Sequence, residues 1–473
     1  MSLIIPANSA AASGGYAVAN SARFQTASLK RSAGSKTNAT KATISMWFKR
    51  SELVDCVLMQ SYTDDSNRAY IKLLGNTFYF FDRSGGTTRN YWVSTFVLRD
   101  VSAFYHLHIN IDTGNGTAAN RFIVHLNGVN QPVANFTNNA TYGSGVTSNW
   151  QQASGTNQFT IGANESVNDQ YFGGYMSEVV YLDGQVVAYD SFGEFDEVSN
   201  IWKPIDGLAD LTVGNTGFYL DLEDSSDLGA DVIGSNDFTA AGLAAIDQST
   251  DTCTNNFCTW NSLDSFYSSA TFSEGNTTVV TPNASLTYAT ATVGLSSGRW
   301  YFEVQPFDPS DNNNIGIVDH VSTSNSSDAG ELQFQPRGWS YRQVGNVYNN
   351  NSSVSGSWDS YSAGVTIGVF VDLEDNKIYW SRNGVMQNSG TGVTITAAAS
   401  TDTGFYFPAV GDYVTNDDTT FRTNFGGVSS FAISSGVTDD NGYGTFEYTP
   451  SVTVDSTAKK FYAICTKNLA EYG

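Results

Sequence analysis

The chain has 473 residues, enough for roughly two or three domains, and its 46 acidic and 23 basic residues give a formal net charge of −23. Such an acidic chain is repelled by phosphate backbones, and the sequence shows no basic patch interleaved with aromatic residues, so we expect no nucleic-acid partner. Neither a heptad repeat nor an apolar run of membrane-spanning length occurs, so we expect no coiled coil and no membrane insertion.

Composition favours strands and turns over long helices, because Gly, Tyr and Phe are abundant (44, 25 and 29 residues) while Leu is scarce. Residues 1–40 show little periodicity. The run from Met1 to Pro6 lacks the basic start of a secretory signal and its apolar stretch ends at the proline, so we expect no signal peptide.

The first strand-rich block is predicted to form a half-buried antiparallel sheet. Within 105–112, apolar residues such as Leu107 and Ile109 alternate with polar ones such as His106 and His108, which gives one apolar and one polar face. The partner strand that follows completes a hairpin over 105–128. Further strands are expected at 42–48, 69–74, 77–82, 91–97, 158–162 and 174–182.

Residues 190–262 are expected to connect two domains. A short helix or irregular segment is predicted over 190–204 and a strand at 218–222, with loops rich in Asp, Ser and Gly after it. Residues 247–262 have almost no core-forming content, which is typical of a linker.

A second block with many short strands and intervening turn signals favours another sandwich. The segment 446–473 is expected to add a strand back onto a domain. Strands of the second block are predicted at 268–272, 285–293, 298–304, 314–318, 330–335, 344–348, 365–382 (a hairpin), 405–410 and 419–425.

Each block contains a hairpin of the same design: a strand ending in Asp, a polar turn, and a strand ending in Asn-Gly-Val. The Asn-Gly pairs at 127–128 and 383–384 readily adopt the positive φ angles of a type I′ turn. We therefore predict an all-β fold of two antiparallel β-sandwich (jelly-roll-like) domains, at 1–189 and 263–445. They are joined by the irregular connector 190–262 and followed by the terminal segment 446–473.

Glu194, Asp196 and Glu197 are the strongest lead to catalysis, because jelly-roll glycosidases place their acids on alternate residues of one strand. Retaining hydrolysis needs two carboxyls about 5 Å apart on one face, but Glu197 comes three residues after Glu194 and points the other way. No nucleophile elbow, phosphate-binding loop or dinucleotide fingerprint is present. We predict a protein that is not an enzyme and keep a glycan hydrolase as an alternative.

Two acidic turns, 221–224 and 372–376, offer carboxylates to Ca²⁺, but they lack the ligand spacing of an EF-hand loop, and Asx-type turns explain them without a metal. His106, His108 and His125 form a cluster in which His108 is expected opposite His125. A metal would need three or four ligands with a supporting shell, so exposed sheet-face histidines are the simpler interpretation. We predict no metal and no cofactor, with Ca²⁺ as the alternative.

Four cysteines, Cys56, Cys253, Cys258 and Cys465, form neither a dense disulfide scaffold nor a zinc motif. Free thiols are the default interpretation, and a Cys253–Cys258 bridge stays open.

Aromatic residues among Gly, Asn and Ser in the second block are the candidate ligand-binding residues. Tyr and Trp with such neighbours offer stacking faces and hydrogen bonds to sugars or peptides, although the same rings equally suit packing under the end of a sandwich. The predicted ligand-binding residues are Trp339, Tyr341, Tyr348, Trp358 and Tyr361.

The first block resembles laminin-G-like, concanavalin-A-like jelly rolls, at 44–48, at the hairpin with Asn127 and Gly128, and at 173–180. The second resembles a SPRY domain, at 298–304, 315–317, 372–384, 407–410 and 424–426. The whole chain is similar to tail-fibre or tail proteins of marine bacteriophages, on the connector 189–221 and the ending 462–472.

This resemblance implies a virion protein, a tail fibre or spike on the tail or particle surface, made in the host cytoplasm and binding a host surface glycan or protein. It also implies contacts with other virion proteins and a homotrimer. Fold alone does not fix function. The alternative is a structural capsid-decoration or tail-assembly protein whose SPRY-like domain makes protein–protein contacts.

Overall fold

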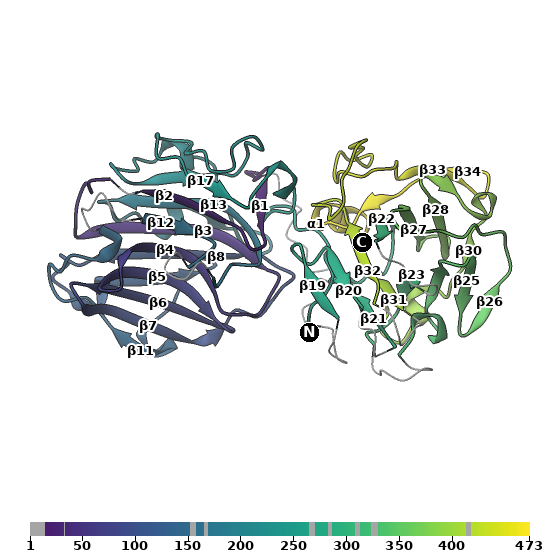
Figure 1. The fold of residues 1–473 in the computed structure, drawn as a ribbon, viewed down its shortest axis with the longest axis horizontal. Coiled ribbons are helices and arrows are strands. Elements are labelled where there is room, and N and C mark those ends of the chain that lie inside the picture. Colours follow the sequence, from purple (N-terminus) through teal and green to yellow (C-terminus); the bar gives the residue numbers. More distant parts are fainter. Residues whose placement is uncertain are drawn as a thin grey trace. The chain divides into compact units, whose positions relative to one another are not determined.

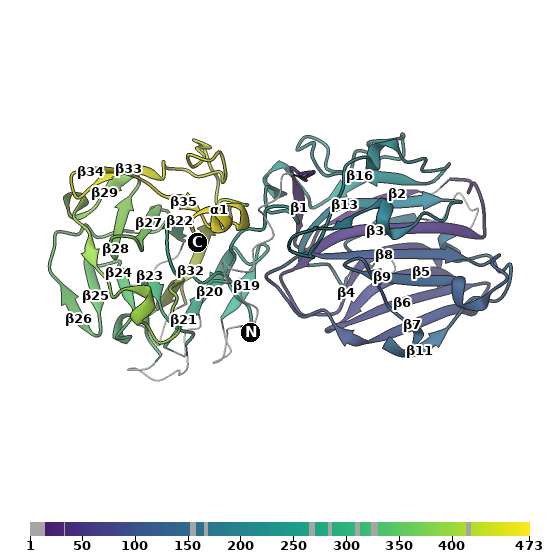
Figure 2. The same cartoon turned by 180° about the vertical axis from the view of Figure 1, so that it is seen from behind.

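The computed structural model describes residues 15–32, 34–151, 158–164, 169–263, 270–281, 286–307, 313–322, 330–412 and 418–473. The chain divides into two compact units, Ser13–Thr254 and Asn255–Gly473, called the first and second unit below. Figures 1 and 2 show that each unit consists of stacked β-sheets, which confirms the predicted all-β sandwich fold. No helix among the described residues is long and apolar enough to cross a membrane.

Sheet A of the first unit has a mainly polar outer face and an apolar inner face. Its strand order is β10-β9-β8-β3-β13-β1-β18, with β16 also pairing with β13. The strands are β1 (Ser21–Phe24), β3 (Lys41–Arg50), β8 (Tyr105–Asp112), β9 (Phe122–Leu126), β10 (Val129–Asn130), β13 (Gly174–Asp183), β16 (Phe218–Leu220) and β18 (Gln248–Ser249).

Sheet B packs against sheet A, and the core lies between them. Its order is β11-β7-β6-β5-β4-β12-β2-β17. Its strands are β2 (Ser28–Ser32), β4 (Cys56–Asp64), β5 (Asn67–Leu74), β6 (Thr77–Ser84), β7 (Thr87–Val97), β11 (Phe136–Ala140), β12 (Gln158–Ile161) and β17 (Thr239–Ala241).

Residues 190–254, which we expected to connect two domains, are part of the first unit. They supply β16, β17 and β18 to the two sheets. Short elements at Tyr189–Ser191 (η5), Glu194–Phe195 (β14) and Trp202–Lys203 (β15) lie between β13 and β16. An ion pair between Lys49 and Asp251, each about 1% exposed, fastens the end of this region. A buried charge pair of this kind has no counterpart in a solvated linker.

In its described residues, the second unit has two large sheets and a two-stranded hairpin at 451–460. Sheet C runs β19-β20-β32-β22-β27-β28-β29, with β30 on β28 and β35 parallel to β22; sheet D runs β21-β31-β23-β24-β25-β26. Sheet C contains β19 (Thr271–Ser273), β20 (Thr278–Val280), β22 (Arg299–Pro306), β27 (Ile367–Asp372), β28 (Lys377–Arg382), β29 (Val385–Met386), β30 (Val393–Thr394), β32 (Thr420–Asn424) and β35 (Tyr462–Ala463). Sheet D contains β21 (Thr287–Thr290), β23 (Asn313–Val318), β24 (Trp339–Arg342), β25 (Asn346–Asn349), β26 (Ser352–Val354) and β31 (Phe407–Asp412).

The terminal segment covers the outer face of sheet C. It contains the hairpin β33 (Ser451–Val454) and β34 (Thr457–Lys460), strand β35, and the helix α1 (Thr466–Tyr472). A cluster of buried rings joins the two, with Tyr301, Phe370 and Tyr379 from the sheet against Phe446 and Phe461 from the segment. Strand β35 confirms the expected return of a strand onto a domain.

Both Asn-Gly turns are confirmed. Asn127 and Gly128 have φ of 48° and 74°, and Asn383 and Gly384 have 48° and 77°, in the region that a type I′ turn requires. These turns join β9 to β10 and β28 to β29, and they follow the longer hairpins β8–β9 and β27–β28.

Two expectations fail. The strand predicted at 330–335 is wrong, because Leu332–Phe334 forms a 3₁₀ turn (η8). The consecutive residues Leu332 and Gln333 are both buried, whereas a strand would point them to opposite faces of a sheet. The core-poor linker at 247–262 is wrong at its end, where Phe257, Cys258 and Trp260 are at most 1% exposed. Parts of the strands predicted at 268–272 and 285–293 lie outside the described residues.

Candidate functional site

The outer face of sheet B carries aromatic side chains on neighbouring strands. Along β6, residues alternate between half-buried and buried positions over the full length of the strand. Phe78 and Phe80 point into the core, so Tyr79 and Phe81 point outward. Strand β6 therefore has rings on both faces, although only the inner face needs them for packing.

The strand register places four rings side by side on this outer face. Phe81 lies directly opposite Tyr70 of β5 and Tyr91 of β7. Its ring centroid is 6.1 Å from that of Tyr70 and 6.2 Å from that of Tyr91, and the Tyr79 and Tyr91 centroids are 5.3 Å apart. Tyr70 is buried, whereas the other three rings are half-buried. We call these four rings the aromatic face.

Basic side chains lie over the same rings. The Lys72 ammonium is 4.2 Å from the Tyr70 ring centre, and the Arg68 guanidinium is 5.8 Å from Tyr70 and 5.9 Å from Phe81. At these distances the cations are attracted to the ring faces. The expectation that the chain has no basic surface interleaved with aromatic residues is wrong for the folded protein, because three strands bring separated residues together.

Protonation on this face is set by burial. Burial, followed by the neighbouring Tyr91 and Tyr70, raises the pKa of Tyr79 to about 12, so its hydroxyl remains a hydrogen-bond donor. Burial and then the positive charge of Arg68 lower the pKa of Lys72, whose ammonium donates to Gln170 Oε1 at 2.9 Å. The face thus offers apolar ring surface, a phenol donor and cations.

Sequence reasoning placed strands at 69–74, 77–82 and 91–97 but did not single out this face. A signal was present. In Phe78, Tyr79, Phe80 and Phe81 aromatic residues occupy both parities of one strand, so one pair must lie on the outer face of the sheet.

Three of the predicted ligand-binding residues lie in the core of the second unit. Trp339, Tyr341 and Tyr361 are 5%, 0% and 3% exposed. The Tyr361 hydroxyl donates to Asn313 Oδ1 at 2.8 Å, and the Tyr341 ring packs 5.0 Å from that of Tyr361. These rings pack under the end of the sandwich and have no open face for a ligand.

Tyr348 and Trp358 remain as candidates. Both are half-buried. Trp358 packs edge-on against the core ring of Trp380 at 5.7 Å, and the Arg342 guanidinium lies 5.2 Å from the Tyr348 ring centre. The structure does not gather the five predicted residues into one surface.

The histidine cluster is buried, contrary to the expectation of exposed sheet-face histidines. His106 and His108 are 0% exposed and His125 is 8% exposed. His108 pairs with His125 in the register, as expected. The covering side chains come from the following segment: Trp202 lies over His106, and Tyr189 stacks on His125 with centroids 4.3 Å apart.

Hydrogen bonds fix the tautomers of these histidines. Trp202 Nε1 donates to His106 Nδ1 at 3.0 Å, so the proton of His106 is on Nε2, which faces Ser45 Oγ at 2.9 Å. His108 Nε2 donates to the Val187 carbonyl at 3.1 Å, and its Nδ1 lies 3.3 Å from His125 Nδ1. Each ring is neutral in this network.

Burial also disfavours the charged form of these three histidines. Burial is the main cause that lowers the pKa of all three imidazoles, that of His108 to about 3. In the described part of the chain, no group of three or more His, Cys, Asp and Glu residues is arranged to hold a metal ion. The cluster attaches the segment 187–202 to sheet A.

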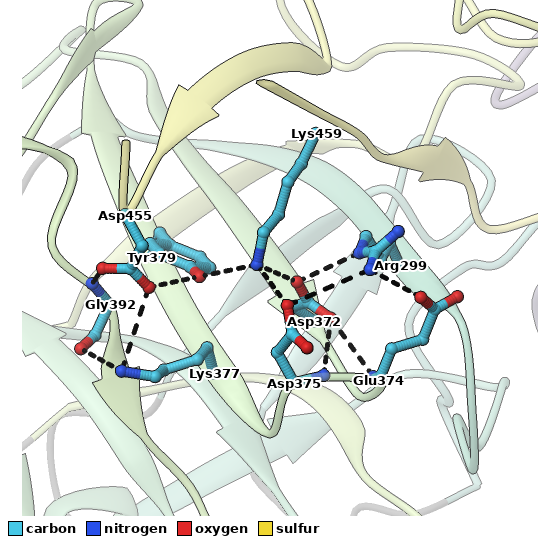
Figure 3. Close-up of polar contacts among 9 residues, drawn as sticks. All are labelled: Arg299, Asp372, Glu374, Asp375, Lys377, Tyr379, Gly392, Asp455 and Lys459. Carbon is cyan, nitrogen blue, oxygen red and sulfur yellow. Dashed lines mark hydrogen bonds and ion pairs between the residues drawn. The ribbon is translucent and has the colours of Figure 1, made fainter. Parts of the chain in front are cut away.

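The acidic turn after β27 is bonded by cations of the chain itself (Figure 3). The Asp372 carboxylate, 0% exposed, accepts from Arg299 Nε at 3.0 Å and from Lys459 Nζ at 2.8 Å. Lys459 also bonds Asp375 at 2.6 Å. Asp372 further accepts from the backbone N–H groups of Glu374 and Asp375, which is Asx-turn geometry.

The other acidic motifs also have local partners. Asp221 and Asp224 accept from backbone N–H groups two residues ahead, again as Asx turns. Glu194 and Asp196 both pair with Lys203 at 3.3 Å, and Asp196 also accepts from the N–H groups of 198 and 199. These carboxylates stabilise turns, and no strand presents them as a catalytic pair.

All four cysteines are free thiols. Cys253 and Cys258 belong to different units, and they are not bridged.

Comparison with protein families identifies both domains. Residues 23–187 match the concanavalin A-like lectin/glucanases superfamily (the Laminin_G_3 model), and residues 299–427 match the SPRY domain. The chain therefore has a laminin-G-like domain followed by a SPRY domain, as the motifs at 44–48 and 298–304 predicted. Curated proteins gave no match to the chain.

Several solved structures are similar to parts of the chain at low sequence identity. The SPRY domain of human HERC1 is 16% identical, over 34% of this chain and 94% of that chain, with a TM-score of 0.27. A "putative carbohydrate binding protein" from Bacteroides ovatus ATCC 8483 is 13% identical, over 48% of this chain and 60% of that chain, with a TM-score of 0.34. Domains LG4-5 of the mouse laminin alpha1 chain are 8% identical, over 86% of this chain and 89% of that chain, with a TM-score of 0.33.

Proposed function

We propose that this chain is a non-enzymatic recognition protein that binds a cell-surface glycan through the aromatic face of its laminin-G-like unit. The observation that carries the proposal is the outward row of Tyr79, Phe81 and Tyr91 on a sheet whose core is complete without them. Sugars pack their C–H groups on aromatic rings and hydrogen-bond to groups such as the Tyr79 hydroxyl. No catalytic pair lies among the described residues of this face.

The proposal extends to a virion: a tail fibre or spike, in a homotrimer with other virion proteins, that adsorbs to a host cell. The connector 189–221 and the ending 462–472 support it through their similarity to phage tail proteins. Particle reconstruction and the mass of the purified protein test the location and the trimer.

Glycan binding is tested by screening the purified chain on a glycan array beside the double variant Tyr79→Ala/Phe81→Ala. The matched control is Phe307→Ala, an aromatic residue that is 50% exposed in the second unit. We expect bound glycans to be lost in the double variant and kept in the control. Equal glycan binding by all three proteins would contradict the proposed site.

A second candidate function is a structural one, in which the SPRY domain contacts another virion protein as a capsid-decoration or tail-assembly protein. Two apolar side chains near each other favour it: the half-buried Trp358 and Val385, which is 68% exposed. Their loops are joined by hydrogen bonds from the backbone N–H groups of Ser357 and Asp359 to the side chains of Asn388 and Gln387. Trp358→Ala would then impair particle assembly and leave glycan binding intact.

A further inference from the structure

The strands of the aromatic face carry positive charge in an acidic chain. Residues 67–97 include four basic residues and a single acidic one, Asp82, which is buried in the core below the face. The whole chain has 23 basic and 46 acidic residues. The basic residues of these strands are Arg68, Lys72, Arg83 and Arg89.

Two of these four cations lack a carboxylate partner at ion-pair distance. Arg68 pairs with Asp65 and Arg89 acts electrostatically on the buried Asp82, but Lys72 and Arg83 form no ion pair with any described residue. Lys72 and Arg83 therefore carry charges that no described carboxylate neutralises at ion-pair distance, and an anionic ligand would pair with them.

Two of the arginines lie opposite one another on adjacent strands. Arg68 of β5 and Arg83 of β6 are direct register partners, so both project from the same face. Like charges directly opposite each other on adjacent strands destabilise a sheet. The Arg83 Nε donates to the Gly86 carbonyl at 3.0 Å, which leaves its charge uncompensated. An anion bound to Arg83 would compensate this charge.

We propose that the aromatic face binds an acidic saccharide, a pyranose chain that carries carboxylate or sulfate groups. The sugar rings lie on Tyr79, Phe81 and Tyr91, and the anionic groups bond to Arg68, Lys72 and Arg83. This inference rests on the proposed glycan-binding function and names its ligand class. The net charge of −23 does not prevent such binding, because exposed charges beyond about 8–10 Å are screened at physiological salt.

The ring geometry favours a sugar over a single-stranded nucleic acid. The Tyr79 and Phe81 rings lie within 19° of parallel, but the Tyr91 ring stands at 68° to Tyr79 and at 78° to Phe81, so the three rings do not form a continuous series of parallel faces for successive bases. Base recognition by a sheet relies on such open stacking faces. A sugar contacts rings through C–H groups and tolerates the tilt.

The test measures binding of the full chain by titration calorimetry to oligogalacturonate, to its neutral methyl ester, to a sulfated oligosaccharide and to a single-stranded oligonucleotide. The variants are Lys72→Gln/Arg83→Gln and the control Arg99→Gln/Lys460→Gln, which removes two charges at exposed positions outside these strands. We expect an acidic sugar to bind about tenfold or more tightly than the ester, because one charge-assisted bond corresponds to at least that factor. Salt and the first variant should abolish this preference, and the control should keep it.

The outcomes separate the two proposals. Equal binding of acid and ester, insensitive to salt and to Lys72→Gln/Arg83→Gln, would overturn the acidic ligand and leave glycan binding in place. No binding of any saccharide would overturn this inference, and a blank glycan array would also remove the proposed function. Tighter binding of the oligonucleotide than of either acidic sugar would overturn the inference in favour of nucleic acid. The carboxylated and sulfated arms identify which anion is preferred.

Discussion

The hydroxyl of Tyr361 marks this ring as part of the core of the second unit. Its single proton is shared between Asn313 Oδ1 at 2.8 Å and the Tyr341 carbonyl oxygen at 3.0 Å, and the ring is 3% exposed. Buried hydroxyls with two partners are positioned by the fold. This residue contributes to stability, and no surface for a ligand is available at it.

We expect Tyr361→Phe to lower the free energy of unfolding of the second unit by about 1–3 kcal/mol, because the carboxamide of Asn313 loses its buried donor. Denaturant unfolding of the variant measures this change, and glycan binding should stay unaltered. A variant with normal stability and lost glycan binding would instead restore Tyr361 as a ligand-binding residue.

The buried histidines of the first unit make its stability depend on pH. Their pKa values in the folded state are lowered from about 6.5, that of His108 to about 3. The folded state therefore binds fewer protons than the unfolded chain below about pH 6.5, and acidification favours unfolding until the folded-state pKa is reached. Asp190 is the charged group that acts on His125 from the covering segment, and it opposes the shift there.

Between pH 6.5 and 5 we expect His106 and His108 each to remove about 1–2 kcal/mol from the unfolding free energy of the first unit. Denaturant unfolding at several pH values measures this loss, and His108→Gln should reduce its slope. The second unit provides a contrast: the hydrogen bond to Asp319 raises the pKa of His320, so its stabilising effect is complete at low pH and is lost as pH rises through that raised value. The raised pKa values of Glu178 and Asp82 in the first unit change its stability in the opposite direction over this window, so the decisive comparison is between the wild type and His108→Gln. An identical pH dependence of these two proteins would contradict the neutral network.

At the scale of elements, the terminal hairpin β33–β34 is attached to sheet C by charges. Burial opposes the charge of Lys459, but hydrogen bonds to Asp372, Asp375 and Tyr379 raise its pKa. Figure 3 shows Lys459 reaching from the hairpin to both carboxylates, with Asp455 bonded to Tyr379 and to the Gly392 N–H on the other side. The acidic turn after β27 is thus the attachment point of the terminal segment.

Lys459→Gln should lower the free energy of unfolding of the second unit by about 1–3 kcal/mol, since Asp372, 0% exposed, keeps only Arg299 as a cation. Limited proteolysis should then cut within 446–473 sooner. Lys460→Gln is the matched control at the next position, where the side chain is 63% exposed, and it should leave both readouts unchanged. Equal resistance of all three proteins to protease would contradict the attachment.

The hairpins could be predicted from their turn residues, whereas the sheet that each later segment covers or extends could not be predicted. Asn127-Gly128 and Asn383-Gly384 carry their conformation in two residues, so local sequence suffices. The covering of sheet A by Trp202 and the Lys49–Asp251 pair depend on residues more than 90 positions apart, which no local pattern reveals. The alternation of polar and apolar residues along β8 predicted that His106 is exposed, but Trp202, from a segment distant in sequence, covers it.

The candidate site divides in the same way. Tyr341 and Tyr361 lie among Asn and Ser, and that composition does not say which side of a strand pair faces the core. The outward rings of the aromatic face could be predicted from the alternation of side chains along residues 78–81. The cations become neighbours of these rings only through the register of β5 with β6. Local alternation therefore predicts the rings, and sheet pairing is needed for the site.

At the scale of the whole molecule, the two sandwich units differ in which sheet faces the chain itself covers. In the first, the segment after β13 covers the outer face of sheet A and leaves the aromatic face of sheet B as the surface with outward rings and cations. In the second, the terminal segment covers sheet C, so its described aromatic clusters are largely internal. The central claim is that the ligand lies on the first of these units.

Hydroxyl-radical footprinting of the full chain, free and saturated with its best-bound saccharide, tests that claim most directly. Oxidation is measured residue by residue by mass spectrometry. The account predicts protection of Tyr79, Phe81 and Tyr91, with Tyr348 and Trp358 unchanged. Protection of Tyr348 and Trp358, with Tyr79, Phe81 and Tyr91 oxidised as in the free protein, would contradict it and place the ligand on the SPRY domain.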